Sequence, residues 1–180
     1  VVNRGINIKS DLYMTPTEVI EKFGWHLTLT GASIYSQQII KESNKIEKSN
    51  FKNFPQIPLI FNNLSKDCRF YWLNDEVIDA PKKKGYWVDK MFEIFIDDWT
   101  NAVMNTTDFY AKSLKYKVIK DHSFKSRVFS IKALISARYE NAYNLKVFLK
   151  YRKKLFIHSQ SGLIILFLIA MLPRFIIKII

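Results

Sequence analysis

The sequence predicts an α/β domain over residues 1–106, followed by a mostly helical, basic tail over residues 107–180. Short β-compatible runs alternate with capped helical segments in the first part, whereas the pattern from about residue 107 onward is helical throughout. The charge changes as well: residues 1–110 hold 13 Lys/Arg and 14 Asp/Glu, whereas residues 111–180 hold 15 Lys/Arg and 2 Asp/Glu. Such asymmetry predicts an anionic partner for the second part alone.

The first helical signal lies at the start of a capped segment. Thr15 is a good N-cap, Pro16 suits the first helical position, and Glu18 stands three residues after Thr15, as in a capping box. The helix should run to about Phe23 and end at Gly24, because a glycine often follows the last helical residue.

The strands of the predicted α/β domain come from short apolar and aromatic runs. Residues 1–8 and 25–35 are β-compatible, and residues 70–72 and 77–78 read as two short strands around a turn. A helix is expected at residues 55–64 between them.

The clearest helix begins near Tyr86, where apolar residues recur at helical spacing up to Val103. Three basic amphipathic segments should follow, at residues 107–120, 123–139 and 142–155. This succession is the predicted helical tail.

The end of the chain is strongly apolar. Residues 163–172 are ten consecutive apolar residues, and ten residues of helix span about 15 Å, half of a ~30 Å hydrocarbon core. We therefore expect a helix that lies in the membrane surface or is partly inserted, with Arg174 and Lys178 reaching the headgroups. The alternative is a C-terminal helix buried against the domain.

No complete catalytic or metal-binding motif is present in the sequence. The single cysteine, Cys68, excludes an internal disulfide and a cysteine cluster, and we interpret it as a core residue. The three histidines share no context. Asp97 and Asp98 point about 100° apart on a helix, so we interpret them as surface residues.

One run nevertheless resembles a known family. Residues 25–36, Trp-His-Leu-Thr-Leu-Thr-Gly-Ala-Ser-Ile-Tyr-Ser, resemble the central segment of family 2 (GT-A type) glycosyltransferases of bacterial cell-surface polysaccharide synthesis. In that family the loop lies under the donor sugar, so the resemblance implies a substrate-binding role for Thr30 and Gly31. A glycine there lets the backbone approach the sugar closely.

The resemblance extends to two later segments. Gln56 stands where the family usually carries its acidic catalytic base; because Gln cannot be a general base, we expect it to bind the acceptor hydroxyl. Lys84 and Trp87 match the loop that leads into the acceptor-side helix, where they would bind pyrophosphate and a sugar face. The catalytic base itself stays unassigned, and Gln56 is the candidate for a catalytic residue at this position.

The resemblance implies a Rossmann-like GT-A sheet of which residues 1–106 form the acceptor side. The full-length enzyme would transfer a glycosyl group from a nucleotide-sugar to a lipid-linked or polysaccharide acceptor, at the cytoplasmic face of the bacterial inner membrane. A divalent cation, Mg²⁺ or Mn²⁺, would be held by an Asp-X-Asp element upstream of Val1 and by no residue of this chain. We therefore expect a fragment that is peripheral on anionic membranes and inactive alone.

Two other functions stay open from the sequence. A basic nucleic-acid-binding protein would use the Lys/Arg-rich segment with its interleaved tyrosines. The ten apolar residues at 163–172 argue against that function. The third possibility is a non-catalytic, membrane-associated remnant.

Overall fold

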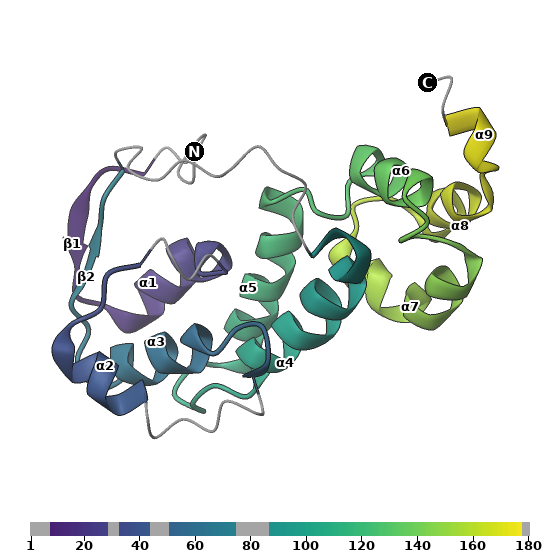
Figure 1. Ribbon diagram of the computed structural model, residues 1–180. Helices are drawn as coiled ribbons and strands as arrows, with labels where there is room; N and C mark the ends of the chain where they lie inside the picture. The colour runs from purple at the N-terminus through teal and green to yellow at the C-terminus, as the bar shows by residue number, and fades with distance from the viewer. Residues whose placement is uncertain (1–7, 29–32, 44–50, 75–86, 178–180) are drawn as a thin grey trace. The chain divides into compact units, whose positions relative to one another are not determined.

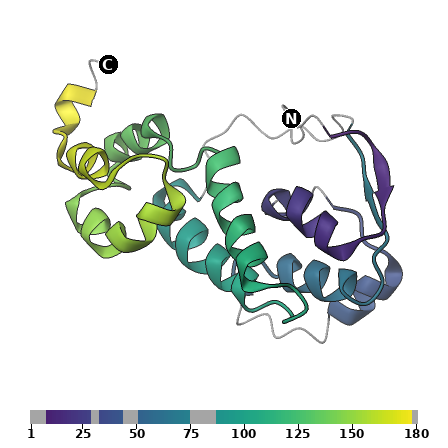
Figure 2. The same cartoon turned by 180° about the vertical axis from the view of Figure 1, so that it is seen from behind.

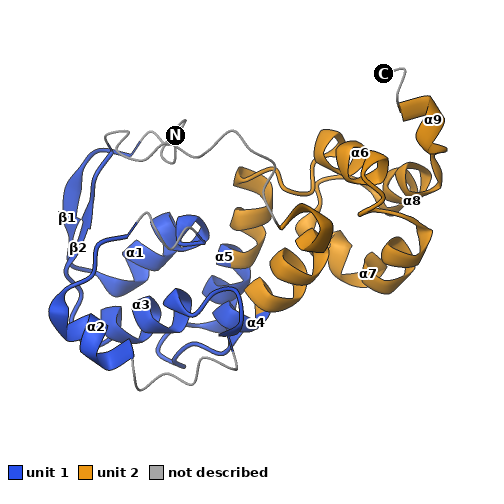
Figure 3. Cartoon of the chain, in the orientation of Figure 1, with its two compact units in different colours: residues 1–83, 101–118 blue, residues 84–100, 119–180 orange. Residues whose placement is uncertain are grey.

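The structure is a computed structural model, and it describes residues 8–28, 33–43, 51–74 and 87–177 (Figure 1). The chain divides into two compact units (Figure 3). The first unit comprises residues 1–83 and 101–118, and the second comprises residues 84–100 and 119–180. The predicted boundary between residues 106 and 107 falls within the first unit.

The predicted α/β class is wrong. Helices hold 65% and strands 4% of the described residues, which contain a two-stranded sheet and no Rossmann-like sheet core. The run expected as a strand at 25–35 begins instead as a 3-10 helix, Gly24–His26, with the indole N–H of Trp25 donating to the Lys22 carbonyl at 3.0 Å. Short aromatic runs suit a helical turn as well as a strand, and here the helical turn forms.

The sheet of the first unit pairs β1, Asp11–Tyr13, with β2, Phe70–Trp72, in antiparallel register (Figure 1). The prediction of a strand at 70–72 is therefore confirmed. Its expected partner at 77–78 and most of the strand at 1–8 lie outside the described residues. Leu12 faces Tyr71 across the sheet, and both side chains are exposed.

Helix α1, Pro16–Phe23, confirms the predicted helix, but its ends differ from the prediction. Thr15 is the N-cap residue without a side-chain cap hydrogen bond, and Gly24 keeps a right-handed φ of −51°. A Cβ at Gly24 would stand 3.0 Å from a methyl carbon of Val118. The glycine therefore allows close packing between α1 and helix α5, Lys112–Lys125, and α1 continues into the 3-10 turn.

Helices α2, Gln37–Ser43, and α3, Gln56–Leu64, complete the framework of the first unit. Helix α3 confirms the prediction at 55–64 and is buried over most of its length. Its carbonyl at Phe61 accepts a hydrogen bond from the Tyr110 hydroxyl at 3.1 Å, and the Asn62 side chain accepts from the Thr107 N–H at 3.0 Å. These bonds attach residues 107–110 to α3.

A buried lysine binds the end of helix α4, Trp99–Met104. Lys115, in α5, is 2% exposed, and its ammonium group donates to the carbonyls of Met104 at 3.2 Å and Thr106 at 2.9 Å. Carbonyls that follow a helix lack intrahelical partners and carry partial negative charge, so a cation satisfies them well.

Replacing Lys115 by Met should therefore destabilise the first unit. Two charge-assisted hydrogen bonds are lost, one of them buried and the other part-buried, which should lower the free energy of unfolding by about 2–4 kcal/mol. Urea denaturation measures this change. Lys112→Met, on the exposed side of the same helix, is the matched control, and an equal loss in both variants would contradict the capping role.

The described part of the second unit begins with a helical segment and continues through the C-terminal part of α5 and four further helices. Residues Val88–Lys90 form a 3-10 helix and Glu93–Asp98 a π-helix before α4, which confirms the helix predicted from Tyr86 to Val103 over its described residues. The others are α5, Lys112–Lys125; α6, Ile131–Tyr139; α7, Leu145–His158; α8, Leu163–Met171; and α9, Arg174–Ile177.

The core of the second unit gathers around aromatic rings. Phe92 stacks on Tyr143 at 5.1 Å with an interplanar angle of 16°, and Leu134, Leu155 and Leu166 are fully buried beside them. Helices α6, α7 and α8 lie together in both cartoon views (Figure 2). The core therefore draws on α8, the most apolar segment of the chain.

Candidate functional site

The structure places Gln56, the candidate acceptor-binding residue, in the interior of the first unit. The side chain is 4% exposed, and its amide N–H group donates to the carbonyls of Leu27 at 3.1 Å and Thr28 at 3.3 Å. Its amide oxygen has no hydrogen-bond partner among the described residues. Gln56 therefore fixes the turn that leads toward Thr30 and Gly31, which lie outside the described residues.

Of the remaining two predicted substrate-binding residues, the structure describes one. Lys84 lies outside the described residues, and Trp87 lies in the second unit, 36% exposed, with its ring 5.4 Å from that of Phe95 in a T-shaped contact. The indole of Trp87 therefore has a structural neighbour and an open side.

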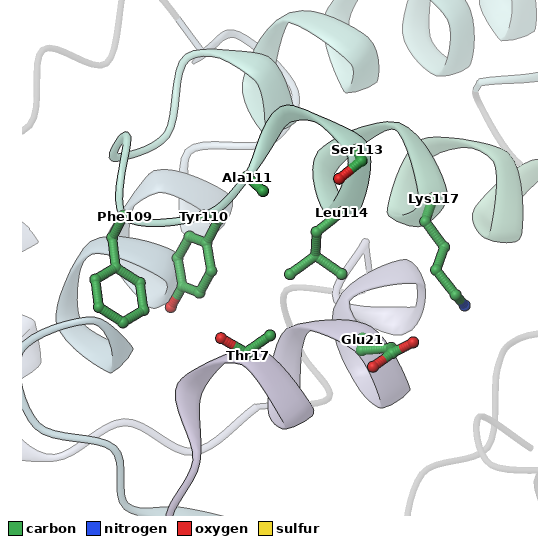
Figure 4. A pocket seen from close by; sticks show the side chains of 8 residues that line it. All are labelled: Thr17, Glu21, Phe109, Tyr110, Ala111, Ser113, Leu114 and Lys117. Atoms are coloured by element: carbon green, nitrogen blue, oxygen red, sulfur yellow. The ribbon is translucent and has the colours of Figure 1, made fainter.

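A groove of about 460 Å³ lies between α1 and residues 109–117 of the first unit (Figure 4). Phe109 and Tyr110 stand at one end, with Glu21 and Lys117 at the other (Figure 4). The Tyr110 hydroxyl donates to the Phe61 carbonyl, and burial raises the pKa of Tyr110. The Tyr110 hydroxyl is therefore engaged in a structural hydrogen bond. The groove contains no group of evident catalytic function. Its lining residues are Thr17, Glu21, Phe109, Tyr110, Ala111, Ser113, Leu114 and Lys117.

Asp97, which we interpreted as a surface residue, is half-buried and joins two elements of the second unit. Its carboxylate accepts hydrogen bonds from the Tyr151 hydroxyl at 2.7 Å and the Lys154 ammonium at 2.5 Å. Burial opposes its charge, but these two donors keep the pKa of Asp97 below its usual value. Among the described residues, no group of three or more His, Cys, Asp or Glu side chains could hold a metal ion.

A buried serine–histidine pair lies at the end of α7. The Ser123 hydroxyl is 2.6 Å from Nδ1 of His158, and the two residues are 2% and 3% exposed. Burial, with a smaller effect of the Lys154 charge, lowers the pKa of His158 to about 4, although Asp97 acts in the opposite direction. A nucleophile needs access to its substrate, so the pair is not a catalytic dyad in this conformation.

The most distinctive surface of the second unit is the outer side of α8. Leu166, Ile169 and Ala170 of this helix face the core. At about 100° per residue, Ile164, Phe167, Leu168 and Met171 share the opposite side. All four are exposed, and they form what we call the apolar face.

Neighbouring residues extend the apolar face. Phe148 of α7 meets Phe167 in a T-shaped contact at 5.6 Å. Leu149 and Phe156 lie about 100° and 80° from Phe148 around α7, and both are exposed. After α8 the chain exposes Phe175 of α9. Exposed apolar side chains therefore occur on all three helices α7, α8 and α9.

Cations accompany the apolar face. Helix α7 holds five Lys/Arg and no Asp/Glu in its 14 residues. The exposed cations in or beside these helices are Lys146, Lys150, Arg152, Lys153, Lys154 and Arg174. An apolar surface next to positive charge is the pattern of a helix that binds an anionic membrane.

Hydrogen bonds fix α8 and α9 to α6. Arg138 donates through Nε to the Leu172 carbonyl at 2.9 Å, and Arg174 donates to the Tyr139 carbonyl at 3.0 Å. The Tyr143 hydroxyl donates to the Leu166 carbonyl at 2.9 Å. The apolar face is therefore held outward by a packed and hydrogen-bonded scaffold.

Comparisons of the chain with models of protein families, with curated proteins and with solved structures give no match. Within the described residues, no helix is long and apolar enough to cross a membrane. The candidate site therefore depends on its geometry alone.

Sequence reasoning found the apolar run but not which of its residues face outward. Every residue of α8 is apolar, so its sequence contains no polar side from which an orientation could be inferred. The contribution of Leu149 and Phe156 was also missed, because they lie within a Lys/Arg-rich helix. Their spacing of seven residues was the available signal.

Proposed function

We propose that the second unit binds the surface of an anionic membrane through the apolar face of α8 and the cations of α7. The observation that carries this proposal is a nine-residue helix with its outer side wholly apolar. Monomeric soluble proteins rarely expose a large contiguous apolar patch without a binding function.

The free energies expected from apolar burial and from charge favour reversible binding to the membrane surface. Ile164, Phe167, Leu168 and Met171 are 77%, 39%, 57% and 51% exposed. Burial of a fully exposed side chain of this kind contributes about 1.5–3 kcal/mol, so these exposed fractions give roughly 3–7 kcal/mol for the face. Each Lys or Arg near an anionic leaflet adds about 1 kcal/mol.

The length of α8 determines the depth of binding. Nine residues of helix rise about 14 Å, against a hydrocarbon core of about 30 Å. The helix would lie at the boundary of headgroups and acyl chains, with Arg174 and the α7 cations among the phosphates. The proposed location is peripheral, at the cytoplasmic face of the bacterial inner membrane.

Nucleic-acid binding is the less favoured function. The cations of α7 would suit a phosphate backbone, but the apolar side chains of α8 would stay in water in such a complex. A lipid surface satisfies both groups at once, which is why we prefer it.

Glycosyl transfer stays a prediction. Its expected framework, a GT-A sheet, is contradicted by the helical fold, and Gln56 is committed to backbone carbonyls. Binding of a nucleotide-sugar to the chain, measured by calorimetry with and without Mg²⁺ or Mn²⁺, tests that prediction separately. The membrane proposal does not depend on its outcome.

Co-sedimentation with vesicles tests the proposed function. The chain should sediment with phosphatidylcholine vesicles that contain phosphatidylglycerol, and binding should weaken but persist at high salt, since salt screens charge and leaves apolar burial intact. A single-stranded RNA serves as competitor. No sedimentation with the anionic vesicles, or complete displacement by the RNA at equal phosphate concentration, would overturn the proposal.

A further inference from the structure

The junction between α7 and α8 contains a buried titratable side chain. His158 is the last residue of α7, and α8 begins five residues later. Its imidazole is enclosed by Ser123 of α5 and by the ring of Phe129, 5.8 Å away. Four residues, 159–162, connect this side chain to α8.

A second contact joins the junction to the loop that contains Phe129, between α5 and α6. The Ser159 hydroxyl donates to the Phe129 carbonyl at 3.3 Å and accepts from the Ser161 N–H at 3.1 Å. Only Gln160, Ser161 and Gly162 separate this contact from the first residue of α8. The packing of His158 and Ser159 therefore sets where α8 starts.

Helix α8 has a composition that suits two environments. Its sequence Leu-Ile-Ile-Leu-Phe-Leu-Ile-Ala-Met contains no polar side chain, so its core-facing side is as compatible with lipid as its apolar face. A helix that only rests on a membrane normally keeps a polar side. Released from the core, α8 would lose protein contacts and regain apolar burial in the bilayer.

We infer that the α7–α8 junction is a pH-sensitive hinge: acidification charges the buried His158, the junction opens, and α8 enters an anionic bilayer more deeply. This inference rests on the proposed membrane function. The helix would keep its cationic neighbours at the headgroups while Leu166, Ile169 and Ala170 exchange the protein core for acyl chains.

The charged and titratable groups around His158 favour this direction. Burial, and then the Lys154 charge one turn earlier, lower the pKa of His158 to about 4, and Asp97 only partly compensates. Asp97 is itself bonded to Tyr151 and Lys154. Among the described residues, Ser123 and the ring of Phe129 also contact His158.

Thermodynamic linkage determines the direction in which pH shifts the opening equilibrium of the junction. The closed junction holds His158 neutral down to about pH 4, whereas the imidazole of an opened, solvated junction has a pKa of about 6.5. Protons therefore favour the open state between these values, and opening should increase on the order of 50-fold from about pH 7.5 to about pH 4.5. An anionic surface at about −30 mV lowers the local pH by about half a unit, which assists opening at the membrane itself.

Hydrogen–deuterium exchange of the full chain in solution tests the hinge without any membrane. After correction for intrinsic exchange, the opening equilibrium of residues 163–171 should rise on the order of 50-fold from about pH 7.5 to about pH 4.5. His158→Gln should remove this dependence. His26→Gln, which removes a partly buried histidine of the first unit whose pKa is also lowered by burial, should retain it.

Vesicles then test the insertion. Phosphatidylcholine–phosphatidylglycerol vesicles loaded with a pH-insensitive dye should release more dye at acidic pH with the unaltered chain and not with His158→Gln. Vesicle binding with pH-independent exchange would overturn the hinge and leave the membrane function intact. Exchange that depends on pH without vesicle binding at any pH would overturn the membrane function and, with it, insertion.

A second variant allows the hinge to be tested if the first variant misfolds. If near-ultraviolet circular dichroism shows that His158→Gln is unfolded, Ser123→Ala replaces it. Loss of the hydroxyl beside Nδ1 removes the acceptor for a protonated imidazole in the closed junction, which lowers the closed-state pKa of His158 further, so acid-induced opening should become larger and should continue to rise at lower pH. An unchanged transition in Ser123→Ala would overturn the role of His158.

Discussion

Replacing Phe23 by Ala is expected to lower the free energy of unfolding of the first unit by about 3–5 kcal/mol. Phe23, the last residue of α1, is 1% exposed, and its ring packs on the sheet. Its ring stacks on Trp72 at 4.7 Å and meets Tyr13 and Phe70 at 5.0 Å each. An isolated two-stranded sheet is marginal in water, so these contacts hold β1 and β2 in place.

Urea denaturation, followed by tryptophan fluorescence, measures the effect of Phe23→Ala, because Trp72 reports directly on the affected cluster. Phe109→Ala is the matched control, since Phe109 is 56% exposed and its removal leaves no buried cavity. The control should change the free energy of unfolding by less than about 1 kcal/mol. Equal losses in the two variants would show that the ring cluster is not the anchor of the sheet.

Local signals explain which elements the sequence could predict. Thr15 and Pro16 mark the start of α1, and helical spacing of apolar residues marks the segment from Val88 to Met104; these signals act within a few residues and survive in the fold. The strand at 70–72 was also predicted. Its partner strand, β1, lies far away in the sequence. No local sequence pattern specifies which distant strand it pairs with.

The fold class could not be predicted because its deciding contacts are tertiary. Gly24 was interpreted as a helix stop, yet the structure uses the missing side chain for contact with Val118. With that packing, the chain stays helical through His26, where the α/β prediction needed a strand. Trp25 and His26, the first residues of the run that resembles a glycosyltransferase loop, are therefore helical where a strand was expected.

The candidate site was predictable in composition and not in orientation. The charge asymmetry and the apolar run at 163–172 are visible in the sequence. Which side of α8 is exposed depends on Tyr143, Arg138 and the core around Phe92, which reach α8 only through folding. The pairing of His158 with Ser123, 35 positions apart, has no sequence signal at all.

The double variant Ile164→Ser/Leu168→Ser should weaken binding to anionic vesicles by about 30- to 1,000-fold. The two side chains are 77% and 57% exposed, so their removal from the membrane contact costs roughly 2–4 kcal/mol, and each 1.4 kcal/mol is about tenfold in affinity. Because neither side chain faces the core, the free energy of unfolding should change by less than about 1 kcal/mol. Vesicle titration at fixed salt measures the affinity.

The matched control places the same substitutions on exposed apolar residues of the first unit. Met14 and Ile40 are 57% and 55% exposed, so Met14→Ser/Ile40→Ser removes a comparable amount of exposed apolar surface. If general hydrophobicity drives vesicle binding, the two double variants will lose affinity equally, and the apolar face has no special role. If α8 is the contact, only its variant loses affinity, and the remaining binding becomes strongly salt-dependent because the α7 cations alone sustain it.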